Sequence, residues 1–200
     1  MSTESKCTTN RIPTSAEYLR LLENWIPTLE KWSHRVTDHP DWAYFGTGGH
    51  EHWAVQAQCT AFAALAVLAT APELNEARIG RSRDSLRIQA LRMLRYFVGT
   101  HKCQSQPCVS GQSWGHSWIS SLGFERCLHG IAALRPWLTG EDLERLSALM
   151  ISESDFLLEG YPVVCAIDGF TGCNKPEMII KLKILRSSPP VILNSRWNNY

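Results

Sequence analysis

Apolar residues recur along most of this chain at the three- and four-residue spacing of amphipathic helices, and almost no stretch alternates as a strand would. Thr14 with Glu17 forms a possible capping box for a first helix, which Pro27 should kink or end. Four more helices are predicted, at about residues 50–70, 82–99, 114–134 and 139–159.

The second and fourth predicted helices differ in kind from the third and fifth. The stretch "CTAFAALAVLA" in the second is Ala-rich and apolar on every side, which indicates burial all round. The third and fifth each combine one apolar stripe with a charged face. This alternation predicts an all-α fold of antiparallel helical hairpins in two layers, with inner helices covered by outer ones.

Two of the helix openings resemble each other. "GGHEHWAVQAQC" and "WGHSWISSLGFERC" both read Gly, His, Trp and then a helix with a cysteine, and the tryptophans are Trp53 and Trp118. Their separation matches one long helical hairpin with its loops. We therefore expect both groups at the same end of two inner helices.

Composition restricts the class of protein. The 200 residues carry a formal net charge of +1, which gives no global argument for nucleic acid or an anionic membrane as a partner. The longest apolar run, 61–69, is well short of the roughly 20 residues that span a bilayer, and the polar start does not resemble a signal peptide. Seven cysteines without framework spacing favour a reducing compartment. The expectation is a cytoplasmic protein that binds neither nucleic acid nor membrane.

Three segments are expected along the chain. Residues 1–13 are polar and predicted to be a disordered tail, and residues 14–177 form the helical domain. Residues 178–200 form an atypical basic tail with four basic residues and no acid.

Candidate chemistry gathers at the two similar helix openings. His50 and His52 fit a metal site, polar residues at the open end of a buried helix, or a substrate site. On a helix their side chains would point about 200° apart, and no third ligand stands at a fixed spacing. Helix-terminal amides favour a bound anion, beside which a neutral imidazole can act as base or donor. His116 has the same options, whereas His129 is expected as a packed or partly exposed core residue.

Other reactive residues are less clearly grouped. Of the carboxylates, Glu125 is expected to pair with Arg126, while Asp168 and Glu177 lie in the Gly-rich loop "AIDGFTGCNKPE". Cys103 and Cys108 could form a disulfide or join a metal site, but no second pair completes a zinc pattern. No nucleophile elbow, phosphate-binding loop or Cys/His protease signature is present. We expect neither a metal nor a cofactor.

The helix alternation, the openings "GGHEHW" and "GHSW", and the later "GFTGCNKPE" together resemble the (α/α) toroid of heparinase II/III-like polysaccharide lyases, a shape shared with six-hairpin glycosidases. The resemblance covers roughly residues 15–177. It implies a partial toroid that binds an acidic polysaccharide or oligosaccharide and cleaves it by β-elimination, with glycoside hydrolysis as the second choice.

The resemblance also implies roles for particular residues. The base and the groups that neutralise a uronate carboxylate would be drawn from His50, His52, His116 and Asn174. The substrate would be bound by Trp53, Trp114, Trp118 and Glu177.

Two departures from that family are visible. Five helices are fewer than such a toroid needs, and the basic tail replaces the expected helical continuation. The expectation is a truncated, frameshifted or alternatively ended version of a longer enzyme, whose activity the missing helices put in question. The alternative is a non-catalytic helical-repeat module that binds a peptide or glycan.

Overall fold

The computed structural model describes residues 12–160, except for the side chains at positions 118, 119 and 121. The predicted site residues Asn174 and Glu177, and Asp168 with them, therefore lie outside the described part of the chain. The same holds for residues 1–11 of the predicted N-terminal tail (1–13), for the predicted tail 178–200 and for the loop "GFTGCNKPE".

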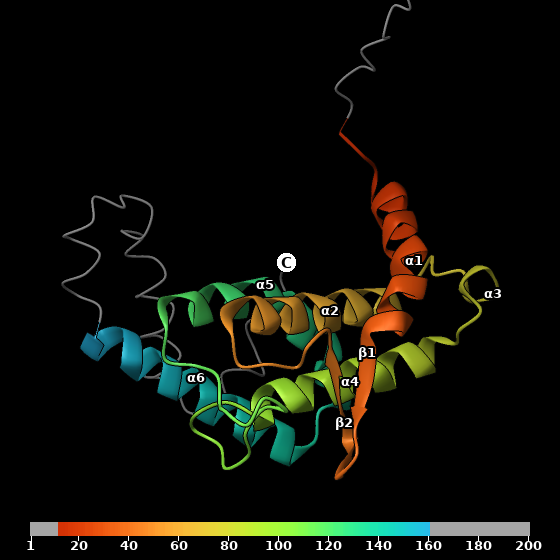
Figure 1. The fold of residues 1–200 in the computed structure, drawn as a ribbon. Coiled ribbons are helices and arrows are strands. Elements are labelled where there is room, and N and C mark those ends of the chain that lie inside the picture. Colours follow the sequence, from red (N-terminus) through yellow and green to blue (C-terminus); the bar gives the residue numbers. More distant parts are fainter. Residues whose placement is uncertain (1–11, 161–200) are drawn as a thin grey trace, which may run out of the picture.

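The described residues are mostly helical, with one small two-stranded sheet (Figure 1). This confirms the all-α prediction in its coarse form, and all five predicted helices are present. The elements in chain order are α1 (Ser15–Trp32), β1 (Ser33–Val36), β2 (His39–Phe45), α2 (His52–Thr70), α3 (Glu76–Ile79), α4 (Arg83–Gly99), α5 (Trp118–Leu134), the 3-10 helix η1 (Arg135–Trp137) and α6 (Gly140–Gly160).

Helix α1 begins as predicted but continues past its proline. Thr14 and Glu17 form the reciprocal capping box. Pro27 lies inside the helix, so the prediction that it could end the helix was wrong. Ile26 and Leu29 are both buried in the core, and this packing on either side of the proline offsets the hydrogen bond that the ring removes.

The β1–β2 hairpin was not predicted. Its strands are antiparallel, with Ser33 opposite Phe45 and an irregularity after Arg35. They are short, and buried and exposed positions do not alternate along them, so their sequence lacks a clear alternation of apolar and polar positions.

A buried glutamine ties the hairpin to two helices. The Gln58 side chain on α2 accepts a hydrogen bond from the Phe45 N–H, at 2.6 Å. Its Nε2 donates to the carbonyl oxygens of Ala43, at 3.2 Å, and Met93 on α4, at 2.8 Å. The amide is therefore satisfied at both ends, as a buried polar group must be.

Helices α2 and α5 run side by side in the same direction. Ser117 at the start of α5 lies near His52 at the start of α2, and Gly130 further along α5 meets Ala63 further along α2. A Cβ atom on Gly130 would lie 2.5 Å from the Cα of Ala63, so the glycine permits the close approach of the two backbones.

Helix α2 is the central helix, and α5 is less buried than predicted. Phe62, Leu65 and Leu68 of α2 are fully buried. In contrast, α5 exposes Leu128 and His129 on one face, so the prediction that it would be buried like α2 was wrong. By length and composition alone α2 could cross a membrane, but 61% of that segment is buried inside the fold, and a core helix meets the same criterion.

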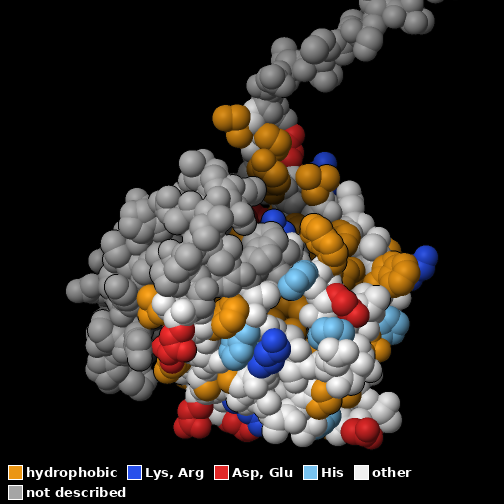
Figure 2. Space-filling model, turned by 60° about the vertical axis from the view of Figure 1, so that its left-hand side comes forward, with side chains coloured by type: hydrophobic (Ala, Val, Ile, Leu, Met, Phe, Trp, Pro, Cys, Tyr) orange, Lys and Arg blue, Asp and Glu red, His pale blue; other side chains and the backbone are white. Residues whose placement is uncertain are grey.

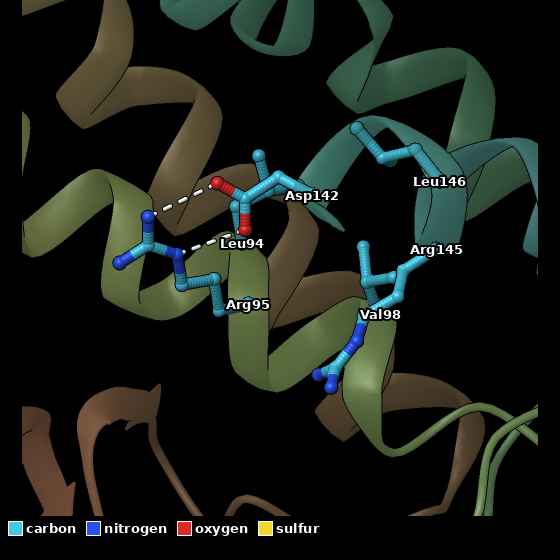
Figure 3. A pocket seen from close by; sticks show the side chains of 6 residues that line it. All are labelled: Leu94, Arg95, Val98, Asp142, Arg145 and Leu146. Carbon is cyan, nitrogen blue, oxygen red and sulfur yellow. Dashed lines mark hydrogen bonds and ion pairs between the residues drawn. The ribbon is translucent and has the colours of Figure 1, made fainter. Parts of the chain in front are cut away.

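Helices α4 and α6 run parallel to each other and antiparallel to α2. Arg83 at the start of α4 donates to the Ala69 carbonyl oxygen near the end of α2, at 3.2 Å. Further along α4, Arg95 makes two hydrogen bonds of 2.9 and 3.0 Å to the Asp142 carboxylate near the start of α6 (Figure 3). The hollow beside this ion pair has a volume of only about 10 Å³, room for about one water molecule. The pair therefore joins two helices and does not line a ligand site.

Candidate functional site

A pocket of about 170 Å³ opens where α2 and α5 begin. Figure 2 shows His side chains gathered around a basic side chain on one face of the molecule. The pocket is lined by residues from both helix openings and from the loop between α4 and α5: His50, His52, Val55, Lys102, Ser113, Trp114, Gly115, His116, Ser117 and Ser120. The structure thus brings together the three histidines that the sequence placed at two separate helix openings.

The starts of α2 and α5 both have backbone N–H groups near this pocket that no described side chain caps. Glu51 precedes α2 and Ser117 precedes α5, and neither side chain makes a capping hydrogen bond within the described residues. Ser117 Oγ instead lies 3.5 Å from His52 Nδ1 and 3.1 Å from Ser120 Oγ. Uncapped helix starts carry partial positive charge, which favours an anion in the pocket.

The loop between α4 and α5 holds His50 in place. The His50 backbone N–H donates to Ser110 Oγ at 3.3 Å, and His50 Nδ1 lies 3.0 Å from the same oxygen. The Glu51 carboxylate is 3.8 Å from this nitrogen. Its ring therefore belongs to a hydrogen-bonded loop contact as well as to the wall of the pocket.

His116 has an unusual backbone conformation, with φ 53°. Its N–H donates to Glu153 Oε1 at 2.6 Å, and its Nε2 lies 2.8 Å from Ser152 Oγ. The ring stacks on Phe156, with the centroids 5.2 Å apart. Burial lowers the pKa of His116, and the opposing effect of Glu153 does not cancel this. The imidazole is therefore neutral at pH 7.

The same backbone conformations explain why α5 starts later than predicted. Gly115 and His116 both have positive φ, which no α-helix accommodates. The chain therefore crosses the end of α4 as a loop, and α5 begins at Trp118 and not near Trp114.

Behind His116 lies a buried pair that the sequence did not reveal. His101 is fully buried, and its Nε2 is 2.7 Å from Glu153 Oε1 on α6. The Cys103 N–H points at the other ring nitrogen, Nδ1, at 3.1 Å. Since a backbone N–H can only donate, Nδ1 is the acceptor and Nε2 carries the proton that Glu153 accepts. No spacing rule connects positions 101 and 153, so their pairing could not be predicted from the sequence.

The ligand atoms of His101, His116 and Glu153 lie within 4.8 Å of one another, close enough to suggest a metal site. His101 Nε2 and Glu153 Oε1 lie only 2.7 Å apart, the length of a hydrogen bond, so the Nε2 proton lies where a metal ion would have to bind. The contacts therefore favour a hydrogen-bonded pair over a metal site.

The predicted tryptophans differ in where they lie relative to the pocket. Trp114 stacks on Phe97 with centroids 4.3 Å apart, and its Nε1 donates to the Phe97 carbonyl oxygen. It is 97% buried, so its ring packs in the core, and only its edge can reach the pocket. Trp53 is 78% exposed and does not line the pocket. The side chain of Trp118 lies outside the described part.

Two smaller expectations also have outcomes. Cys103 and Cys108 are both free thiols, so the possible disulfide is absent between them. Arg126 donates to Gln56 on α2 at 2.9 Å, a cross-helix contact in place of the local pair expected with Glu125.

No protein-family model matches this chain, and no curated protein and no solved structure is significantly similar to it. The function proposed below is therefore based on the residues of the pocket.

Proposed function

We propose that the pocket binds one carboxylated sugar unit of an acidic polysaccharide and that the chain is a segment of a polysaccharide lyase. The observation that carries this proposal is the character of the lining. Three imidazoles, the Lys102 ammonium and several serine hydroxyls meet at two uncapped helix starts, and none of the described lining residues has a carboxylate. Such a lining complements an anion.

The helix directions support a partial (α/α) toroid as the framework. In a two-layer ring of hairpins, inner helices run parallel to one another and antiparallel to the outer ones. Helices α2 and α5 share one direction, and α4 and α6 share the opposite one. The inner pair would then present its helix starts to the substrate groove.

The chemistry proposed is elimination. His116, neutral at pH 7, takes the proton from the carbon next to the uronate carboxylate, while Lys102 and the helix starts neutralise that carboxylate. The electron pair forms a C=C bond, and the glycosidic oxygen leaves. Glycoside hydrolysis needs two facing carboxylates, which the described lining does not supply.

The size of the pocket limits what it can hold. Drug-sized ligands occupy about 300–1,000 Å³, and this pocket has about 170 Å³. It accommodates one ring or its carboxylate, so a polymer would extend beyond it.

The unsaturated sugar produced by elimination absorbs ultraviolet light, which gives a direct assay. The full chain is incubated with polygalacturonate, alginate, hyaluronan and heparin, and we expect absorbance to rise with at least one of them. His116→Asn keeps a residue that tolerates positive φ and should lower the rate by about 100-fold. His129→Asn, an exposed site on α5, is the matched control and should leave the rate unchanged.

Two outcomes would contradict the proposal. Binding of a polyuronate without any rise in absorbance would favour the non-catalytic binding module. Absence of binding to every member of the panel would remove the acidic saccharide as the ligand.

A further inference from the structure

Cys103 lies against the buried pair described above. Its Sγ is 3.0 Å from His101 Nδ1, and His101 Nε2 is 2.7 Å from Glu153 Oε1. Cys103 is exposed, whereas His101 and Glu153 are buried. A thiol, an imidazole and a carboxylate thus stand in one hydrogen-bonded row, with the partly buried thiol at its outer end.

The protonation states in this row follow from one backbone contact. Because the Cys103 N–H already donates to Nδ1, this nitrogen has its lone pair directed toward Cys103. The thiol S–H can donate to the same nitrogen, and the proton on Nε2 goes to Glu153. The imidazole therefore has the tautomer that a base for this thiol requires.

Glu153 is placed to stabilise His101 after it accepts a proton. Its Oε1 contacts His101, and its Oε2 is buried with no hydrogen-bond partner in the described part of the chain. A buried carboxylate that is not fully solvated favours a positive charge beside it. Burial raises the pKa of the Cys103 thiol, so the sulfur needs such a base to react near pH 7.

We propose that Cys103 is a base-activated nucleophile that accepts an acyl group from a carboxylic ester, with His101 as the base and Glu153 as the positioning residue. The thiol proton moves to His101 Nδ1 while sulfur attacks the ester carbonyl carbon. The S–C bond forms, the C–O bond of the ester breaks, and the departing alcohol takes the proton back from Nδ1. The product is a thioester on Cys103.

Further groups surround the sulfur. Gln104 Nε2 lies 3.5 Å from Sγ, where it can donate to a developing thiolate. The charged and titratable neighbours are Glu153 and His116 behind the imidazole and Lys102 in the adjacent position. Cys103 is not among the lining residues of the pocket, so this proposal does not depend on the saccharide function.

Alkylation by iodoacetamide tests the nucleophile. The rate at each cysteine is measured by peptide mass spectrometry from pH 5 to 9, with N-acetylcysteine as the reference thiol. We expect Cys103 to react at pH 6 to 7 about tenfold or more faster than the reference, because general bases commonly contribute 10²–10⁴-fold. The buried thiols of Cys59, Cys108 and Cys127 serve as internal controls and should react slowly. A Cys103 rate no higher than that of N-acetylcysteine would overturn the proposal.

The variant Glu153→Gln separates positioning from packing. It keeps the shape of the side chain and an oxygen for His101 but removes the charge that stabilises the imidazolium. The enhanced rate at pH 6 to 7 should fall toward that of the reference thiol, while circular dichroism shows retained helices. If the carboxylate acted only by repelling a thiolate, the rate would rise instead, and His101 would not be the base.

The acyl step is tested with 4-nitrophenyl acetate. Wild-type protein should release nitrophenolate and carry one acetyl group on Cys103, and Cys103→Ser should show neither rapid release nor that modification. Fast alkylation without acetylation would refute ester acyl transfer. Loss of the saccharide activity would have no bearing on either measurement.

Discussion

Gly115 lies where the loop between α4 and α5 passes over the His101 ring. Its φ is 117°, and a Cβ atom there would overlap the imidazole and come within 3.0 Å of Glu153 Oε1. His116, the next residue, then has its N–H directed at the same carboxylate oxygen. The position of His116, the base of the proposed elimination, thus depends on a neighbouring residue without a side chain.

Gly115→Ala should therefore destabilise the fold and disturb the pair beneath it. We expect a loss of about 3 kcal/mol in the free energy of unfolding, from backbone strain together with overlap. Gly111→Ala is the matched control, since Gly111 also has positive φ, 82°, but open space around it. Strain alone should cost about 1 kcal/mol there. Urea unfolding measures both, and equal losses would show that the overlap is relieved without cost.

At the scale of elements, two glycines on α5 face α2 with different clearances. A Cβ on Gly130 would lie 2.8 Å from the Ala63 Cβ, but one on Gly123 would meet Cys59 Sγ at 3.4 Å. The helix pair is thus in backbone contact at one point and in ordinary side-chain contact at the other.

These clearances predict that a Gly→Ala substitution changes the free energy of unfolding in opposite directions at the two positions. Alanine normally gains up to about 1 kcal/mol over glycine inside a helix. Gly123→Ala should show that gain or be neutral, whereas Gly130→Ala should destabilise by about 2 kcal/mol because the helices must separate. Thermal unfolding of the two variants provides the comparison. Stabilisation by Gly130→Ala would mean that α2 and α5 are not in close contact there.

At the scale of the whole molecule, the Arg95–Asp142 pair joins helices α4 and α6. Burial acts to raise the pKa of Asp142, but hydrogen bonds from Arg95 and Thr139 outweigh it, and the pKa lies below its ordinary value. A carboxylate of this kind stabilises the fold above the pKa of the unfolded chain, about 3.9. That contribution is lost as the pH falls below this value.

The melting temperature of the wild-type protein should therefore decrease as the pH falls from about 5 to 3. In Asp142→Asn the decrease should be smaller over this range, because the paired carboxylate is already absent. At pH 7 the variant should be less stable than wild type, since the half-buried Arg95 loses its hydrogen-bonded carboxylate partner. Parallel pH curves for the two proteins would contradict this assignment.

Much of the helical framework was predictable because its signals are local. The capping box of α1, the apolar stripe of α4 and the ends of α2 and α6 follow from neighbouring residues. The hairpin escaped prediction because Gln58, distant in the sequence, satisfies its backbone groups.

The candidate site was predictable in part. The similar helix openings led to His50, His52 and His116, which the structure places around one pocket. The core position of Trp114 follows from its stacking on Phe97, a contact between separate elements. The pairing of His101 with Glu153 likewise depends on how α6 packs near the end of α4, which no local pattern encodes.

One oxygen atom, Glu153 Oε1, accepts hydrogen bonds from both His101 and the His116 backbone. The imidazole beside Cys103 and the pocket at the helix starts therefore share an acceptor. A proton or an acyl group gained at one place alters the electrostatic field at the other. Thermodynamic linkage makes such an influence reciprocal: an anion that binds better after Cys103 is modified must, to the same degree, favour the modified protein.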